Sequence, residues 1–439
     1  MNKGFFFSIL ALFLGNTVVC AQRMLTLEEA IATTLQNNYD IRLSKNDSMV
    51  AALDYSYRNA AFLPTLNGVA STTWNANNQR QTLADGSKRE QKNIRSHSSA
   101  ASAQLNWVLF DGLKMFATRD KVEEFVKLGE LGIRNQVINS VSEVITTYYN
   151  IVRQKQQLKS VEEQIALNEE RVRLSQYKLD IGTGAKPDLL QSKVDLNEQK
   201  ALKLEQLTLI EQLKEQLNQL MNITPGTGFE VSDSIPLNTE LGLGDIQMDL
   251  EQTNPRLLIA RKNIDIARLT LKERKAERLP VISFNSAYNY SRTDNKKVIN
   301  PFSPLFNQAN GLNYGFSASI PLFNRFNAKR LIKQAELDIQ YQQLVFENER
   351  SVIHLDIIRA FKNYELQKKA LALEEENILL ARENVDIVFQ TYKLGAATLV
   401  QLREAQNSLE TANNRLIAAR YAMKVAETEL LRLKGALAN

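Results

Sequence analysis

Few side chains in this sequence have the type and spacing that catalysis, cofactor binding or metal binding requires. The two histidines, His97 and His354, are far apart, and neither has an Asp, Ser or Cys partner in a recognisable arrangement. The one cysteine, Cys20, stands near the N-terminus. The sequence contains neither a glycine-rich phosphate loop nor a cluster with metal-ligand spacing. We therefore expect no catalytic, cofactor-binding or metal site, and we expect the protein not to be an enzyme.

The first residues have the pattern of a secretory signal. An apolar run over 5–19 follows a single lysine and is followed by the small residues Cys20-Ala21. The run is shorter than the roughly 20 apolar residues of a membrane-spanning helix. Cleavage after Ala21 would leave an exported chain that begins at Gln22 and has no thiol. Lipidation of Cys20 is the alternative, which the bulky Val19 before it disfavours.

Charge and composition narrow the class of protein further. The chain has 54 Lys and Arg residues against 49 Asp and Glu, a net charge of +5, and the two signs are well mixed even in the run 272–278. Such mixing is typical of solvated helix faces and, together with export, argues against nucleic acid as a partner. Glycine and proline are scarce, with 17 and 9 residues, which predicts long helices.

The chain consists of two copies of one unit. An offset of 213 residues pairs Gly182 with Gly395, and the same offset holds without a gap across the second half of each copy. Upstream the offset is 216, as between Leu63-Pro64 and Leu279-Pro280. We therefore divide the chain into a signal peptide over 1–21, a first repeat over 22–222, a linker over 223–245 and a second repeat over 246–439.

Directly after each Leu-Pro pair, apolar and polar side chains alternate. Residues 66–76 and 282–291 alternate in this way, and further alternating segments over 101–109 and 312–322 follow a polar loop in each copy. We expect these loops to be about twenty residues long and to face outside. Four amphipathic strands of this length indicate a barrel with lipid outside and water inside. A soluble sandwich with a one-sided core is the alternative.

Four strands cannot close a barrel, because about eight are needed even for a barrel filled by its own side chains. An open sheet in lipid would leave unpaired backbone groups on each edge at several kcal/mol apiece. We therefore expect several subunits to pool their strands, and three chains would supply twelve.

The residues between the strands predict helices of unusual length. Nothing breaks the chain from Gly112 to Ile181, and about 70 helical residues span about 105 Å. Shorter helices are expected over 26–62 and 187–222. Residues spaced alternately by three and four indicate a coiled-coil seam with some polar members. In the first copy the seam residues are Leu158, Val161, Ile165, Asn168, Val172, Ser175 and Leu179.

This layout resembles the TolC-type outer-membrane efflux proteins over essentially the whole mature chain. The resemblance rests on the two copies, the Leu-Pro strand entries, the strand-to-helix junctions at 109–112 and 322–324, and the motif Gly182-x5-Asp188-Leu-Leu-Gln. It implies a mixed α/β membrane protein: a homotrimer with a twelve-stranded barrel in outer-membrane lipid and a long helical tunnel in the periplasm.

The resemblance also implies a function and partners. The chain would be a passive exit channel of a tripartite efflux or secretion system. It would dock on a periplasmic adaptor (membrane fusion) protein, and an inner-membrane transporter would supply the energy. Type I protein secretion is one alternative role. A soluble periplasmic coiled-coil adaptor or structural protein is another, although adaptor helices flank compact β domains instead of paired strands.

The resemblance assigns the periplasmic gate to the far ends of the helices. In the family's Tyr-x2-Gly-x-Arg-x3-Asp-x2-Asp pattern, Tyr392 and Gly395 match, whereas Ala397 replaces the arginine and Gln401 the first aspartate. Glu404 keeps the charge at the last position. The family's arginine latch therefore does not carry over to this chain.

Asp188, Tyr392, Gln401 and Glu404 remain as candidate gate residues. In a trimer, Asp188 or Glu404 would form a ring of three like charges that attracts cations. The alternative is that Asp188 only favours the dipole of a helix start and Glu404 is only solvated.

The turns at Gly182, Gly184 and Gly395 are the candidate adaptor contacts, because glycine permits the tight reversal and exposes backbone.

Overall fold

The computed structural model describes residues 23–438, so the expected signal peptide lies outside the described residues. The chain forms two compact units. Of the described residues, the helical unit comprises 23–43, 134–254 and 353–438, and the sheet unit comprises 44–133 and 255–352. Each sequence repeat contributes residues to both units.

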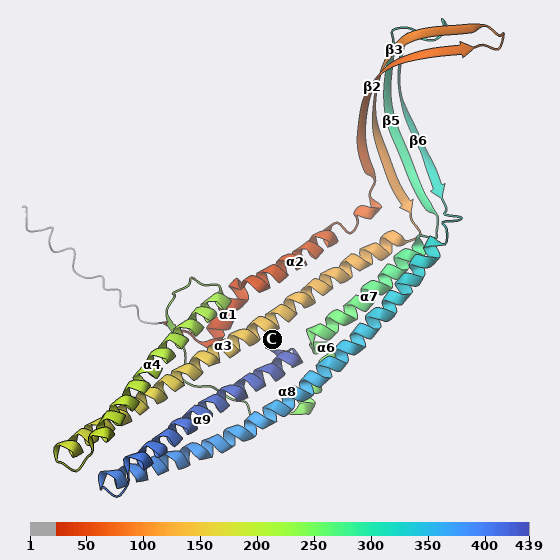
Figure 1. The fold of residues 1–439 in the computed structure, drawn as a ribbon. Coiled ribbons are helices and arrows are strands. Elements are labelled where there is room, and N and C mark those ends of the chain that lie inside the picture. Colours follow the sequence, from red (N-terminus) through yellow and green to blue (C-terminus); the bar gives the residue numbers. More distant parts are fainter. Residues whose placement is uncertain (1–22, 439) are drawn as a thin grey trace, which may run out of the picture. The chain divides into compact units, whose positions relative to one another are not determined.

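The sheet unit is built on one antiparallel sheet of four strands (Figure 1). Their order is β2-β3-β5-β6, with bounds β2 Thr65–Thr82, β3 Lys88–Phe110, β5 Val281–Asn295 and β6 Phe306–Ser319. Each repeat supplies one hairpin, and β3 of the first repeat pairs with β5 of the second. The first strand of the first repeat, β2, and the last strand of the second, β6, are therefore the two edges of this sheet.

The two hairpins have the same register. Gly68 lies opposite Ala103 in the first hairpin, and Phe284 lies opposite Phe316 in the second. These are equivalent pairs at the offsets of 216 and 213 residues, so the strand pairing confirms the internal repeat.

The first hairpin is longer than expected. Residues 77–82 and 88–100 extend the ladder, and only the turn over 83–87 separates β2 from β3. Gly86, at φ +82°, and the Asp85 carboxylate, which accepts a bond from Ser87 N at 2.9 Å, form this turn. The prediction of a loop of about twenty residues is wrong here. Hydrogen bonds between the two backbones continue past the last apolar residues, and because both faces of these strand ends are polar, no alternating pattern marks them as strands.

The second hairpin also differs in its boundaries. Strand β6 begins at Phe306 instead of residue 312, and the connection from β5 is correspondingly short. The strand ends at Ser319, before Pro321, although alternation continues to Leu322. Proline has no N–H to donate to a strand ladder. The alternating pattern therefore extends a few residues beyond the end of the hydrogen-bonded strand.

Four helical segments accompany the sheet in its unit: α2 (Tyr39–Ser56), α7 (Pro255–Ala276) and the first turns of α3 (Lys114–Asp180) and α8 (Asn327–Lys393). Helix α3 is joined to α7 by ion pairs, including Lys262–Glu124 at 2.6 Å. Helix α7 is joined to α8 by Arg256–Glu349 at 2.6 Å. On the other side of α3, Gly129 closely approaches Ser48 of α2. The lateral order is therefore α2, α3, α7, α8.

The helical unit contains the remaining turns of α3 and α8 with α1 (Leu27–Asn37), α4 (Lys186–Met221) and α9 (Leu399–Lys434). Ion pairs link α4 to α3, Lys203–Glu162 at 2.7 Å, and α9 to α8, Arg420–Glu375 at 3.7 Å. Since α3 also bonds to α9, the lateral order is α4, α3, α9, α8. The smaller elements are β1 (Arg23–Met24), β4 (Phe229–Glu230), α5 (Leu243–Gln247), α6 (Leu250–Thr253) and two 3-10 turns, Ala60–Phe62 and Ala436–Ala438.

The core of the helical unit lies where α1, α3 and α4 meet the short β1–β4 pair. Tyr148 is 1% exposed there, and its hydroxyl donates to the carbonyl of Leu25 at 2.9 Å. Val144, Leu217 and Val231 are fully buried in the same cluster. This core holds Leu25 and the linker residues Phe229 and Val231 against the long helix α3.

The helix expected over 26–62 is interrupted at Asn38. The Asn38 side chain accepts bonds from Asp40 N at 2.9 Å and Ile41 N at 3.2 Å, and its amide donates to the carbonyl of Leu220 at 2.8 Å. It therefore ends α1 and caps α2, which the unbroken apolar pattern did not indicate. The long helix is confirmed as α3, and the helix expected over 187–222 is α4.

Among residues 23–438, no helix combines the length and apolarity needed to cross a membrane. In the same part of the chain, His, Cys, Asp and Glu do not gather in any group of three that could bind a metal ion.

Candidate functional site

Two tight turns end the helical hairpins of the helical unit. The first joins α3 to α4, where Gly182 has φ +76° and its N–H donates to the carbonyl of Leu179 at 3.0 Å. The second joins α8 to α9, where Gly395 has φ +79° and its N–H donates to the carbonyl of Tyr392 at 3.1 Å. Both glycines have open space where a side chain would be, so their left-handed backbone, and not crowding, requires glycine.

Gly184 is required for a different reason. An added Cβ would lie 2.9 Å from the backbone nitrogen of Leu179 and 2.9 Å from the carbonyl carbon of Lys178. The N–H groups of Thr183 and Gly184 both donate to the carbonyl of Lys178, at 2.9 and 2.8 Å. The first turn is therefore a closely packed loop with exposed backbone.

The expected gate residues occupy different environments. Asp188 is exposed in the first turn of α4. Gln401 forms a capping box with Thr398: its side chain accepts from Thr398 N at 2.8 Å, and its own N–H donates to Thr398 Oγ1 at 3.3 Å. The start of α9 is thus fixed by Gln401.

Tyr392 is the gate candidate that links the two hairpins. It is 5% exposed, and the ammonium of Lys178 lies 3.8 Å from its ring centre. The same ammonium donates to the carbonyl of Tyr392 at 3.1 Å. Tyr392 therefore connects the end of α8 to the end of α3.

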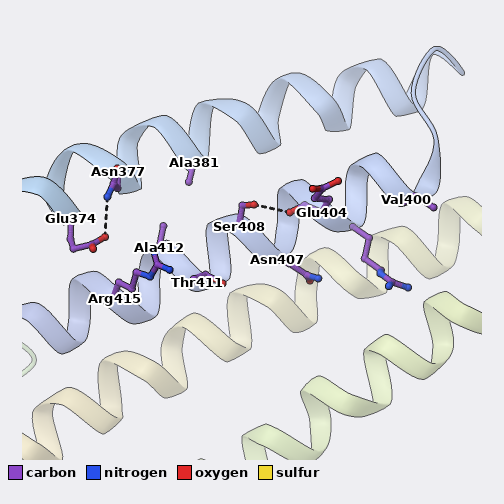
Figure 2. A pocket seen from close by; sticks show the side chains of 11 residues that line it. Glu374, Asn377, Ala381, Val400, Glu404, Asn407, Ser408, Thr411, Ala412 and Arg415 are labelled. Carbon is purple, nitrogen blue, oxygen red and sulfur yellow. Dashed lines mark hydrogen bonds between the residues drawn. The ribbon is translucent and has the colours of Figure 1, made fainter.

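Glu404 lines an open groove of about 650 Å³ between α8 and α9. Figure 2 shows Asn377 and Ala381 on α8 facing Ser408 and Ala412 on α9, with Glu404 one turn away. The hydroxyl of Ser408 donates to the backbone carbonyl of Glu404 at 2.9 Å, and the Glu404 side chain is exposed. Among the described residues, no hydrogen bond joins Asp188, Gln401 and Glu404 to one another.

A buried polar cluster lies between α3, α4 and α9 and was not predicted from the sequence. The Arg171 side chain is 2% exposed, and its guanidinium donates to Asp195 Oδ2 at 2.5 Å and to Gln406 Oε1 at 2.8 Å. Burial lowers the pKa of Arg171, which the charge of Asp195 opposes. Polar residues in the expected seam, such as Asn168, were the only sequence signal of this cluster.

The cluster is incompletely satisfied. Arg171 Nε, Gln199 Oε1 and Gln406 Nε2 are buried without a hydrogen-bond partner in the described part of the chain. They line a cavity of about 280 Å³ together with Glu410. Because buried polar groups cost free energy when unpaired, this seam between α3 and α9 separates more easily than an apolar seam would.

We expect Glu410→Gln to stabilise the helical unit at neutral pH. Burial raises the pKa of Glu410 above 4.5, with a further contribution from Glu198, so the folded state binds this proton more tightly than the unfolded chain does. The wild type therefore loses stability as the pH rises through this raised pKa. Melting at pH 7 should be higher for the variant than for the wild type, with the difference lost near pH 4. The exposed Glu205→Gln is the control, and equal melting of all three proteins at pH 7 would contradict the assignment.

Comparisons with known proteins agree with this geometry. The family described as "Outer membrane efflux protein" matches residues 30–224 and 248–436. The outer membrane efflux protein BepC of Brucella suis biovar 1 (strain 1330) is 21% identical, with 97% of this chain and 89% of BepC covered. The alkaline protease secretion protein AprF of Pseudomonas aeruginosa PAO1 is 21% identical, with 94% of this chain and 87% of AprF covered.

A solved structure shows the same fold. The outer membrane protein VceC of Vibrio cholerae superposes with a TM-score of 0.75 at 15% identity, covering 93% of this chain and 96% of VceC. The resemblance seen in the sequence is thereby confirmed, and the alternatives of a soluble sandwich and a soluble adaptor are not supported. The two matched stretches span most of the chain, which belongs to the outer membrane efflux protein family and is a channel, not an enzyme.

Proposed function

We propose that this outer-membrane channel works as a homotrimer and is the passive exit duct of a tripartite system. The observation that carries the proposal is the open four-stranded sheet, whose edges are β2 and β6. About eight strands are the minimum for a closed barrel, so one chain cannot enclose a pore. Three copies of this sheet would supply twelve strands.

Energetics favour the pooled barrel. Strands β2 and β6 have 18 and 14 residues, so each edge presents several backbone N–H and C=O groups. Each unpaired group costs several kcal/mol in lipid, and the sum exceeds the typical stability of a folded domain. Closure of the ring removes both edges at once.

The turns at Gly182, Gly184 and Gly395 would be the docking points for a periplasmic adaptor protein. They end the hairpins α3–α4 and α8–α9, and their backbone is held in tight, exposed loops. An inner-membrane transporter bound to the adaptor would supply the energy for transport.

The gate would lie beside these turns. Tyr392 and Lys178 hold the ends of α3 and α8 together, while the incompletely satisfied cluster at Arg171 lies along the same hairpins. In a trimer, the exposed carboxylates of Asp188 and Glu404 would each form a ring of three like charges. Such rings attract cations to the aperture.

We expect Glu404→Gln to weaken block of the channel by divalent cations several-fold, because the ring loses its charge. Single-channel recordings with and without a divalent cation measure this effect. Glu383→Gln, an exposed substitution on α8, should leave the block unchanged. If Glu404→Gln conducts and is blocked like the wild type, Glu404 has no part in the gate.

Protein secretion is a narrower second function. One relative is named for the secretion of alkaline protease, whereas another is named for efflux. The channel would serve either purpose, since the associated pump selects the substrate.

Co-purification tests the proposal. Crosslinking in intact cell envelopes, followed by purification of this chain, should recover an adaptor and an inner-membrane transporter in one complex. The identity of that transporter then separates efflux from protein secretion. Recovery of an intact outer-membrane oligomer that never brings either partner would contradict the tripartite role.

A further inference from the structure

The charged residues of the sheet are confined to one end of it. No Lys, Arg, Asp or Glu occurs in the four stretches that make up most of the sheet, 63–79, 98–109, 281–291 and 298–323. The segments 80–97 and 292–297 instead carry eight Lys and Arg residues against three Asp and Glu, an excess equal to the net charge of +5 of the whole chain. The sheet is therefore neutral over most of its length and strongly basic at the end away from the helices (Figure 1).

Part of this basic end lies on the face of the sheet that meets lipid. Successive side chains of a strand point to opposite faces, and the apolar face includes Tyr290 of β5. Arg292 is two residues further along β5 and shares that face. Arg95 of β3 is ten residues from Leu105 and also shares it. Both strands are central in the order β2-β3-β5-β6, so neither basic residue lies at an edge of the sheet.

Arg95 and Lys296, which directly follows β5, form a pair of like charges. The N–H of Lys296 donates to the carbonyl of Arg95 at 2.9 Å, one step beyond the ladder pair Ser96–Asn295. Side chains of directly opposite residues begin about 5 Å apart, and like charges in such a pair destabilise it. Both side chains are exposed, and in the described part of the chain neither forms an ion pair. An anion between them would relieve this repulsion.

Aromatic side chains border the pair on the same face. Trp74 is 72% exposed and stacks on His97, with the ring centres 5.0 Å apart. On β6, Phe306 is 52% exposed, and the guanidinium of Arg292 lies 5.2 Å from its ring centre. Exposed aromatic rings are typical of the boundary between lipid tails and head groups. The lipid face therefore changes from apolar to aromatic to basic within a few residues.

The opposite face of the sheet is uncharged at this level. One row of paired residues crosses all four strands there: Thr73, Ser98, Thr293 and Asn307. This face turns toward the water-filled interior of a barrel. A basic cluster that attracted anionic solutes to the channel would lie on the interior face. The position of Arg95 and Lys296 on the other face indicates a ligand that belongs to the membrane.

We propose that Arg95 and Lys296 bind the phosphate group of an outer-leaflet glycolipid of the lipopolysaccharide kind. A phosphate monoester has a charge of about −1.5 to −2 at neutral pH and three acceptor oxygens, so one group bonds to both members of the pair. Arg292 is bonded to Asp294 at 2.8 Å and contributes less. The inference rests on the barrel of the proposed function, because only a sheet in the outer membrane presents this face to lipid.

Lipid co-purification tests the site. The channel, extracted from outer membranes in mild detergent, would be analysed by mass spectrometry of the intact complex for bound glycolipid. Arg95→Gln with Lys296→Gln should lower the amount bound per chain at least about fivefold, because each basic residue beside an anionic head group changes the affinity by about that factor. Unchanged glycolipid in this variant would overturn the site.

The matched control removes the same charge from the same hairpin. Lys88→Gln with Arg89→Gln changes two basic residues beside the turn, where β3 pairs with β2 and not with β5. This variant should retain the bound glycolipid of the wild type. An equal loss in the two double variants would show diffuse attraction to the basic end of the sheet, and would overturn a site at Arg95 and Lys296.

A charge reversal gives two effects of opposite sign. Lys296→Glu converts the like-charged pair into an ion pair with Arg95, which favours the strand pairing. The variant should melt no lower than the wild type and still lose its bound glycolipid, because the carboxylate repels phosphate. Glycolipid retained by this folded variant would contradict the proposal.

Defined ligands separate a lipid head group from free phosphate. The delipidated wild type in detergent should bind lipid A more tightly than dephosphorylated lipid A. Inorganic phosphate at millimolar concentration should not displace lipid A, because the exposed rings of Trp74 and Phe306 contact only the lipid. Displacement by inorganic phosphate, or equal binding of dephosphorylated lipid A, would overturn the assignment to a phosphorylated lipid.

Failure of this site is distinguishable from failure of the proposed function. The substituted residues lie outside the uncharged interior face, so all three variants should assemble and conduct like the wild type. A wild type that conducts in bilayers but retains no glycolipid would overturn the site and leave the channel intact. A wild type that neither assembles nor conducts would instead contradict the proposed function.

Discussion

Gly112→Ala is expected to prevent the sheet unit from folding, and with it the assembly of the channel. Gly112 has φ +76°, and an added Cβ would lie 2.4 Å from the carbonyl oxygen of Ala276 and 2.8 Å from Leu279 Cβ. A left-handed backbone costs an alanine about 1–2 kcal/mol, and the clash with backbone adds to this cost. We expect a total above about 4 kcal/mol, a range in which marginal domains unfold.

The position of Gly112 explains the size of this effect. It follows Asp111, whose carboxylate accepts from Met115 N at 3.0 Å and so starts α3 directly after β3. The measurement is the amount of folded, protease-resistant protein in outer-membrane fractions. Gly132→Ala is the matched control, because nothing lies within 4 Å of its added Cβ and alanine favours a helix interior. Equal yields of the two variants would refute the prediction.

Arg171→Ala is expected to cost the helical unit about 3–5 kcal/mol, because it leaves a largely buried Asp195 carboxylate without its cation. The Asp195 side chain is 16% exposed, and Gln406 loses the same donor. Loss of this link should also loosen α3 from α9. Thermal unfolding measures the first effect, and protease cleavage near the turns measures the second.

Two further variants separate charge from packing. Arg173→Ala removes an arginine that is 77% exposed and should change stability by less than about 0.5 kcal/mol. Arg171→Met combined with Asp195→Leu should recover most of the loss, because a paired apolar replacement leaves no isolated buried charge. The role assigned to Arg171 is wrong if its alanine variant melts like the Arg173 variant.

The long-range plan of the fold could be predicted from the sequence because helices and strands impose fixed periods. An offset of 213 residues without gaps requires matching element lengths, and α3 and α8 indeed have 67 residues each. The tight reversals at Gly182 and Gly395 were predictable for the same reason, since left-handed turns favour glycine.

Boundaries that depend on backbone pairing were not predictable from apolar patterns. The polar ends of β2 and β3 pair with each other in spite of their composition. Asn38 interrupts a helix through a bond to Leu220, which is 182 residues away. The spacing Thr398-x-x-Gln401 is that of a capping box, so the role of Gln401 at the start of α9 was predictable from the sequence alone.

The buried polar cluster around Arg171 could not be predicted from the sequence, for a physical reason. Arg171 is 24 residues from Asp195 and 235 from Gln406, and each side chain alone is typical of a solvated helix face. Only the packing of α3 against α4 and α9 brings them together. Their burial, not their type, makes them important to the helical unit.

The central claim is that three chains together form a passive channel, and its most direct test is an electrical recording. The protein, extracted from outer membranes in mild detergent, would be sized and then added to a planar lipid bilayer. We expect an oligomer of three chains that inserts and conducts ions in discrete, uniform steps without any energy source. A water-soluble monomer whose strand amides are protected from hydrogen exchange, together with a bilayer that shows no current steps, would contradict the account.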